Sequence, residues 1–117
     1  MENKQIKIKR AYEKYSKNDG ARILVDRLWP RGKTKKGLKI KEWMKDIAPS
    51  LELIKWFGHD QKKWPDFKQK YKKELKEKKE LAEKLKQTAK NGALTLLYSA
   101  KDTERNNAVA LKEFLEE

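Results

Sequence analysis

Two short apolar segments, residues 21 to 26 and 93 to 98, constrain the fold of this chain more than any other feature. Both consist mainly of aliphatic side chains, in a sequence of 117 residues of which 42% are charged and only 37% are hydrophobic. Apolar runs of this length are typical of strands that are covered on both faces, as in a parallel sheet. A right-handed crossover through the intervening segment would place the two strands parallel in one sheet.

The remaining pattern completes a single small α/β domain. Residues 5 to 9 alternate apolar and polar side chains, which predicts a half-exposed strand. Helical spacing predicts an insert over residues 38 to 47, 51 to 57, 65 to 75 and 81 to 89, and a C-terminal helix capped by Asp102 or Thr103. We expect one domain over residues 1 to 117, with a mixed or parallel sheet of about three strands. The helical insert lies between the last two strands, and a helix follows the last one.

Several classes of protein are excluded by what the sequence lacks. No apolar run approaches the roughly 18 residues of a membrane span, and the first five residues lack the apolar stretch of a secretory signal. With no Cys, the chain has no disulfide, Cys-based zinc site or thiol nucleophile, and its single His leaves no partner for a His-rich metal site. We therefore expect a cytoplasmic protein with no membrane partner, metal or other cofactor.

The net charge of +13 comes from 31 basic and 18 acidic residues, and 26 of the basic residues are Lys. This excess fits either a polyanion partner bound through counterion release or the Lys enrichment of a genome or a thermophilic lifestyle. The five Arg residues carry more information, because the guanidinium binds carboxylate or phosphate in a bidentate manner that Lys cannot reproduce. They are Arg10, Arg22, Arg27, Arg31 and Arg105.

Dense polar motifs follow both apolar segments, at residues 26 to 32 and 99 to 107. If the two strands are parallel neighbours, both motifs face one crevice at the carboxyl ends of the strands, where α/β proteins bind ligands. Arg27, Arg31 and Lys101 would supply positive charge there. A helix starting near Asp102 would add free amide groups, and Gly32 would permit close backbone approach. Phosphate, nucleotide and carboxylate ligands would all suit such a site.

We assign tentative roles within this site by side-chain chemistry. Asp26, His59 and Asp102 could transfer protons. The predicted ligand-binding residues are Arg27, Trp29, Arg31, Gly32, Tyr98, Lys101, Arg105 and Asn106. Two plainer interpretations stay open. Asp26, Arg27, Lys101 and Asp102 could form an internal ion-pair network with Trp29 as an apolar plug, and His59, next to Asp60, could be an ordinary loop residue.

Three blocks of the sequence, residues 23 to 32, 56 to 60 and 96 to 102, resemble the YeaO-like family. That family is a branch of a broad bacterial and archaeal domain family of unknown function. The resemblance covers almost the whole chain and implies a small cytosolic α/β domain without an established activity. The broader family often carries a Cys-His pair after the acidic residue of the last block. This chain has Asn106 and Asn107 there, so thiol or imidazole chemistry is not implied.

Two functions remain for this chain. The first is a cytosolic domain that binds a small anionic ligand between the two motifs, a site compatible with hydrolase or transferase chemistry. The alternative is a nucleic-acid-binding module of the regulator type that uses the Lys-rich surface. Interspersed acidic residues between the Lys residues favour the first, because modules that read nucleic acid concentrate Arg and aromatic residues on one face.

Overall fold

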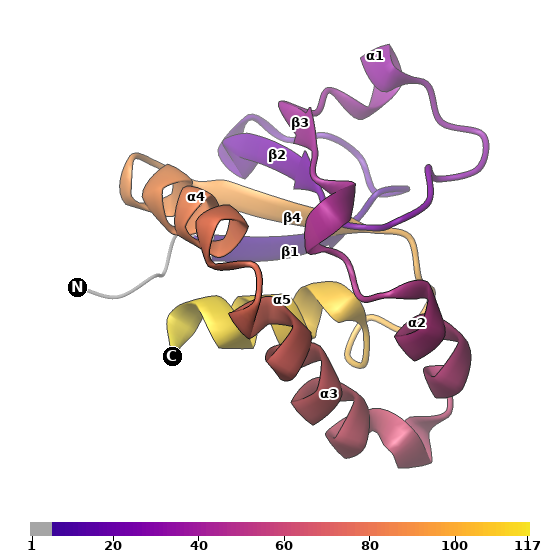
Figure 1. The fold of residues 1–117 in the computed structure, drawn as a ribbon. Helices are drawn as coiled ribbons and strands as arrows, with labels where there is room; N and C mark the ends of the chain where they lie inside the picture. The colour runs from indigo at the N-terminus through magenta and orange to yellow at the C-terminus, as the bar shows by residue number, and fades with distance from the viewer. Residues whose placement is uncertain (1–5) are drawn as a thin grey trace.

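The computed structural model describes residues 6–117 and consists of a four-stranded sheet with helices packed mainly on one face (Figure 1). The strands are β1 (Ile6–Arg10), β2 (Ala21–Leu24), β3 (Glu42–Trp43) and β4 (Leu94–Tyr98). Their spatial order is β1-β4-β2-β3, and every neighbouring pair is parallel. The α/β class and the parallel pairing of the two apolar segments are thus confirmed. The predicted first strand is also present, although Gln5 lies outside the described residues.

The central position of β4 explains its composition. β1 and β2 both pair with it, opposite Leu94 at their first residues, and all five residues of β4 are buried. Leu94, Leu96 and Tyr98 face the helices, together with Ile23 and Val25 from the segment of β2. Alternate residues therefore point to the opposite face, which carries Thr95 and Leu97.

One part of the sequence interpretation is wrong. Residues 38 to 47 do not form a helix but divide into α1 (Lys35–Leu38), β3 and the short 3₁₀ helix η2 (Lys45–Ile47). Lys39 ends α1 with a positive φ of 52°. The amides of Lys41 and Met44 then donate to the carbonyl oxygens of Arg22 and Leu24. Pairing with the exposed edge of β2 outweighs a weak helical periodicity, and the sheet gains a fourth strand.

The other predicted helices are confirmed, and their boundaries follow local signals. They are α2 (Leu51–Phe57), α3 (Trp64–Lys76), α4 (Lys79–Lys90) and α5 (Asn107–Glu116), with the 3₁₀ helix η3 (Gln61–Lys63) before α3. The hydroxyl of Ser50 accepts from the Leu53 amide to cap α2, and Gly58 ends that helix at a φ of 51°. The predicted break in the apolar stripe after Leu75 separates α3 from α4.

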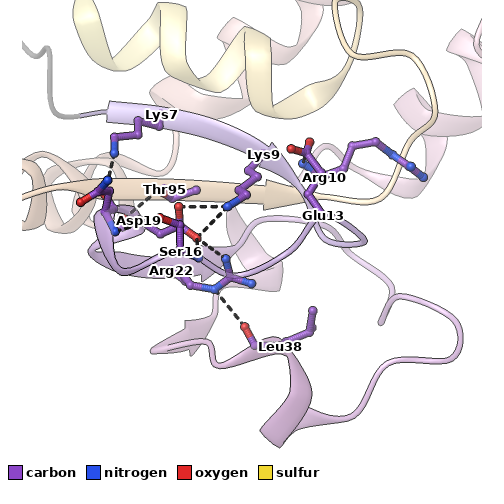
Figure 2. Close-up of polar contacts among 10 residues, drawn as sticks. Lys7, Lys9, Arg10, Glu13, Ser16, Asp19, Arg22, Leu38 and Thr95 are labelled. Atoms are coloured by element: carbon purple, nitrogen blue, oxygen red, sulfur yellow. Dashed lines mark hydrogen bonds and ion pairs between the residues drawn. The ribbon is translucent and has the colours of Figure 1, made fainter.

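The opposite face of the sheet carries a buried polar cluster (Figure 2). Asp19, which ends the 3₁₀ helix η1 (Lys17–Asp19), is 4% exposed, and Arg22 in β2 is 2% exposed. Figure 2 shows the side chains of Lys9 and Arg22 converging on the Asp19 carboxylate. Arg22 also donates to the Leu38 carbonyl, and Thr95 donates to the Asp19 carbonyl. This cluster therefore connects β1, β2, β4 and α1.

Hydrogen bonds decide the charge state of Asp19. Burial by itself would raise the pKa of this carboxyl, but hydrogen bonds from Lys9, from the Ser16 amide and from Arg22 outweigh burial and lower it. The ionised form is therefore favoured more in the folded chain than in the unfolded one. Its contribution to stability is present above the ordinary pKa of Asp and is lost as the pH falls below about 4.

We predict that Asp19→Asn lowers the free energy of unfolding by about 3 kcal/mol at neutral pH, because it leaves the buried Arg22 and the half-buried Lys9 without a counter-charge. Urea denaturation measures this change. The difference from the wild type should shrink as the pH falls below about 4. Asp46→Asn is the control, since Asp46 is exposed, and it should change stability by less than about 0.5 kcal/mol. Equal effects of the two substitutions would contradict this account of the cluster.

Candidate functional site

A cleft of about 780 Å³ opens at the carboxyl ends of β2 and β4. Its walls are formed by the segments that follow these two strands, by α2 and by the loop after α2. Because β2 and β4 are parallel neighbours, the two polar motifs meet here, although more than 60 residues separate them in the chain. The sequence interpretation placed its candidate site at this position.

Nine of the eleven predicted site residues line this cleft: Asp26, Arg27, Trp29, Arg31, His59, Lys101, Asp102, Arg105 and Asn106. Tyr98 does not line it, because its side chain points into the core and is 2% exposed. Gly32 is also absent from the lining. It adopts a φ of 79°, and a Cβ added there would meet nothing within 4 Å. The positive φ of Gly32 is a conformation that favours glycine in the turn after Arg31.

Asp26 is the most constrained group in the cleft. One carboxylate oxygen accepts hydrogen bonds from the amide and the hydroxyl of Ser99, at 2.9 and 2.6 Å. The other accepts from the Asn107 amide nitrogen at 3.1 Å. Burial raises the pKa of Asp26, while the bonds from Ser99 and Asn107 act in the opposite direction. The residue connects the end of β2 to the end of β4 and to the first turn of α5.

Asp102 has a different role from the predicted one. The last helix starts at Asn107, and the side chain of Asn106 caps it by accepting from the Val109 amide. Asp102 instead accepts from the amides of Glu104 and Arg105, and it lies 3.4 Å from the Arg105 guanidinium. These two amide bonds are the main reason why the pKa of Asp102 is lowered, with smaller contributions from Arg105 and His59. The Asp102 carboxylate therefore stabilises the turn before α5 and does not cap that helix.

Arg27 and Trp29 hold the loops around the cleft. The guanidinium of Arg27 donates to the carbonyl oxygens of Pro49 and Ala48 at 3.1 and 3.2 Å. The indole of Trp29 donates to the Lys33 carbonyl and packs edge-on against Trp43, with ring centroids 5.2 Å apart. Both residues still line the cleft, but part of their hydrogen-bonding capacity is used within the protein.

The proposed ion-pair network of Asp26, Arg27, Lys101 and Asp102 is wrong for the described part of the chain. Within residues 6–117 no ion pair joins any two of these four side chains. Arg31 and Lys101 are both exposed, and their side chains have no hydrogen-bond or ion-pair partner in that range. Arg27 also has no acidic partner, but its guanidinium donates to two backbone carbonyls, so Arg31 and Lys101 are the lining cations whose side chains have no partner within residues 6–117.

His59 lies at the rim of the cleft with a positive φ of 59°, and its ring centroid is 6.2 Å from that of Phe57. Asp60 does not orient the imidazole, since its carboxylate accepts from the Lys62 amide and caps η3. The geometry therefore places His59 next to the cleft without the hydrogen bond that a general base of the Asp-His type requires.

The sequence interpretation missed two groups of residues in the cleft. Ser99 and Asn107 belong to the second polar motif, and only the pairing of β2 with β4 shows that they bind Asp26. The apolar wall consists of Leu28, Leu51, Ile54 and Phe57. Leu28 is 73% exposed and Leu51 is 52% exposed, which is unusual for leucine. Leu51 could not be distinguished from a core residue by its helical spacing alone, and Leu28 lies in the loop after β2, where no periodicity applies.

Among residues 6–117 no group of three or more His, Asp or Glu side chains is placed to hold a metal ion. No helix in that range is long and apolar enough to cross a membrane. The cleft itself is lined by two cations without a side-chain partner, two hydrogen-bonded carboxylates, an imidazole and an apolar wall.

We predict that Ser99→Ala raises the pKa of Asp26 further, because the carboxylate loses the 2.6 Å bond from the Ser99 hydroxyl. A titration of the Asp26 carboxyl carbon by NMR measures this shift. The variant should lose about 1 to 3 kcal/mol of stability at neutral pH and less near pH 4, where the carboxyl is protonated more readily. Thr103→Ala, at an exposed position of the same motif, should leave that titration unchanged. A lowered or constant pKa in Ser99→Ala would contradict the assignment.

Residues 5–117 match the model of a family described as the inactive DUF488-N3 subclade. The chain is 44% identical over 110 residues to the uncharacterised protein YeaO of Escherichia coli, an alignment that covers 94% of this chain and 96% of that protein. It is 34% identical over 111 residues to an uncharacterised protein of Mycobacterium tuberculosis, covering 95% and 93%. No solved structure matches it. The chain therefore belongs to the YeaO-like family, within the inactive DUF488-N3 subclade.

Proposed function

We propose that this protein is a binding domain for a small anionic ligand that carries an apolar group, held in the cleft between the ends of β2 and β4. The observation that carries the proposal is the presence of two unpaired cations in the lining of the cleft. Arg31 and Lys101 are exposed to the cleft and have no acidic partner within residues 6–117. Two such cations favour phosphate or carboxylate, which a charged hydrogen bond can fix in one orientation.

The carboxylates of the cleft do not neutralise these cations. Asp26 is occupied by Ser99 and Asn107, and Asp102 is occupied by two backbone amides and Arg105. The carboxylate oxygens of both acids are thus engaged by donors of the protein and leave Arg31 and Lys101 without an acidic partner.

The apolar wall defines the second part of the ligand. Leu28, Leu51 and Ile54 expose side chains at the cleft, and the Trp29 ring also lines it. Ligand sites usually combine such apolar lining with a few polar groups that set orientation. A ligand with an aromatic or aliphatic body and one anionic group would contact both parts, whereas a bare inorganic anion would contact only the cations.

The family to which the chain belongs favours a domain that binds this ligand without catalysing a reaction on it. The subclade to which the chain belongs is described as inactive, and this chain has Asn106 and Asn107 where relatives in the broader family often have a Cys-His pair. Asn106 caps α5, and Asn107 donates a hydrogen bond to Asp26. The side-chain amides of both residues therefore have structural roles at the positions of that pair. We expect this binding to take place in the cytoplasm, for the reasons of composition given above.

We predict that phenyl phosphate raises the melting temperature of the protein, that inorganic phosphate raises it less, and that phenol has no effect. Arg31→Ala and Lys101→Ala should each weaken the binding of phenyl phosphate by about ten- to a hundredfold, since each removes one charged hydrogen bond. Both side chains are exposed, so the stability of the unliganded variants should stay within about 0.5 kcal/mol of the wild type. Thermal shift assays and calorimetric titration measure these effects.

The matched control is Lys90→Ala, which removes one exposed cation at the far end of α4 and should leave binding unchanged. Arg27→Ala is a poor test, because it also removes the bonds to Ala48 and Pro49. Binding that is equal in Arg31→Ala, Lys101→Ala and wild type would refute the proposed site. So would the absence of any thermal shift with phenyl phosphate at millimolar concentration.

A further inference from the structure

A second positively charged surface begins at the edge of the cleft, where Tyr12 belongs to the lining, and extends over the layer that covers the polar face of the sheet. We call it the basic layer and define it as residues 11 to 20 and 33 to 41. The two segments are in contact, because the Lys39 ammonium lies 4.6 Å from the centre of the Tyr15 ring and the Lys33 ammonium lies 5.5 Å from that of Tyr12. Figure 1 shows α1, from the second segment, on the side of the sheet away from α3 and α5.

The charges of the basic layer are not compensated. It contains seven Lys: Lys14, Lys17, Lys33, Lys35, Lys36, Lys39 and Lys41. Its two acidic residues are Glu13, which accepts from the Arg10 amide, and Asp19, which is buried against Lys9 and Arg22. None of the seven Lys forms an ion pair within residues 6–117, and all except Lys33 are exposed. The layer therefore presents its charge to solvent.

The Lys-rich helices differ from this layer. Lys68 pairs with Glu113, Lys72 with Glu117 and Lys84 with Glu42. Ion pairs therefore neutralise part of the positive charge of α3 and α4. The interspersed acids seen in the sequence belong to these helices, not to residues 33 to 41, which contain no acid before Glu42. In the basic layer, by contrast, none of the seven Lys residues is paired within residues 6–117.

Two exposed aromatic rings lie among these charges. Tyr12 is 39% exposed and Tyr15 is 42% exposed. Cations lie over the faces of both rings: Arg10 and Lys33 over Tyr12, and Arg22 and Lys39 over Tyr15. The large hydrophobic residues that the protein exposes elsewhere, such as Leu28, Leu51 and Trp56, are outside the layer. The layer therefore has flat rings and cations but no exposed aliphatic side chain to insert into a membrane.

We infer that the basic layer binds single-stranded nucleic acid, with unpaired bases stacked on Tyr12 and Tyr15 and backbone phosphates next to the flanking Lys residues. Stacking on aromatic rings combined with a basic track is how proteins hold single strands with little regard to sequence. A duplex fits less well, because the faces of its bases are stacked on neighbouring base pairs and are not available to the Tyr rings. The helix of the layer, α1, has only four residues, too few to read a major groove. Tyr12 also lines the cleft, whereas Tyr15 does not, so substitution of Tyr15 tests this inference separately from the ligand proposed for the cleft.

The test is the fluorescence anisotropy of labelled oligouridylate and oligothymidylate, each of about 12 nucleotides, a length within the range that one small module covers. The full chain is expected to bind at low salt and to weaken as salt rises. Tyr15→Ala should weaken binding about tenfold, whereas Tyr15→Phe should retain it, because stacking needs the ring and not the hydroxyl. Lys35→Gln combined with Lys36→Gln should reduce the salt slope by about 1.4, since two phosphate contacts are lost.

The matched control is Lys76→Gln combined with Lys79→Gln, which removes the same charge from exposed positions between α3 and α4. Equal losses in the two double variants would show attraction by net charge alone and would overturn the inference. Equal affinity for polyglutamate, unchanged affinity in Tyr15→Ala, or no binding at low salt would also overturn it. Circular dichroism checks that each variant is folded.

Discussion

The fold depends on covering both faces of a parallel sheet in a chain with few hydrophobic residues. A parallel sheet has no face that it can leave to solvent, and in this chain the main apolar cluster lies on only one of the two faces. The helices α2, α3, α4 and α5 take that face, packed on Ile23, Leu96 and Tyr98. The other face is completed by charged groups, with Arg22 and Asp19 buried against each other. The basic layer proposed above lies on the second of these faces (Figure 1).

On the polar face, the covering layer is thin and its free Lys side chains remain in water. Asp19 neutralises Lys9 and Arg22, which come from the sheet itself, and none of the Lys residues of the basic layer. The buried cluster is thus the reason why the layer can be compact and still strongly positive. Lys39, for example, ends α1 and lies over Tyr15, while the Leu38 carbonyl beside it accepts from Arg22.

At the carboxyl edge of the sheet, the pairing of β2 with β4 sets the chemistry of the cleft. Asp26 follows β2 by two residues and Ser99 follows β4 directly, so the strand register brings them to 2.6 Å. The place of the site and nine of its residues could be predicted, because parallel strands end at the same edge. The partners of each charge could not. Arg27 and Arg31 lie in one motif, yet one binds backbone carbonyls and the other is free.

The errors in the predicted secondary structure also come from contacts between distant parts of the chain. Leu38, Trp43 and Ile47 have near-helical spacing, but the open edge of β2 offered backbone hydrogen bonds to Lys41 and Met44, and a strand formed instead. Asp102 is a good helix cap by residue type, yet Asn106 caps α5, because Asn107 must reach both the Val25 carbonyl and Asp26. In both places a contact between distant parts of the chain outweighed a local preference.

The sequence by itself determined the α/β class, the two buried strands, most helix boundaries and the edge of the sheet where polar motifs meet. These properties depend on side-chain periodicity, caps and the geometry of parallel strands, which are local or general. Only the tertiary structure decided which charged side chains are paired within the protein and which face solvent without a partner. Arg22 and Lys35 are both cations in the same part of the sequence, but one is buried against Asp19 and the other is exposed without a partner. The physical reason is that the state of a charge depends on neighbours brought close in space by the sheet, not on neighbours in the sequence.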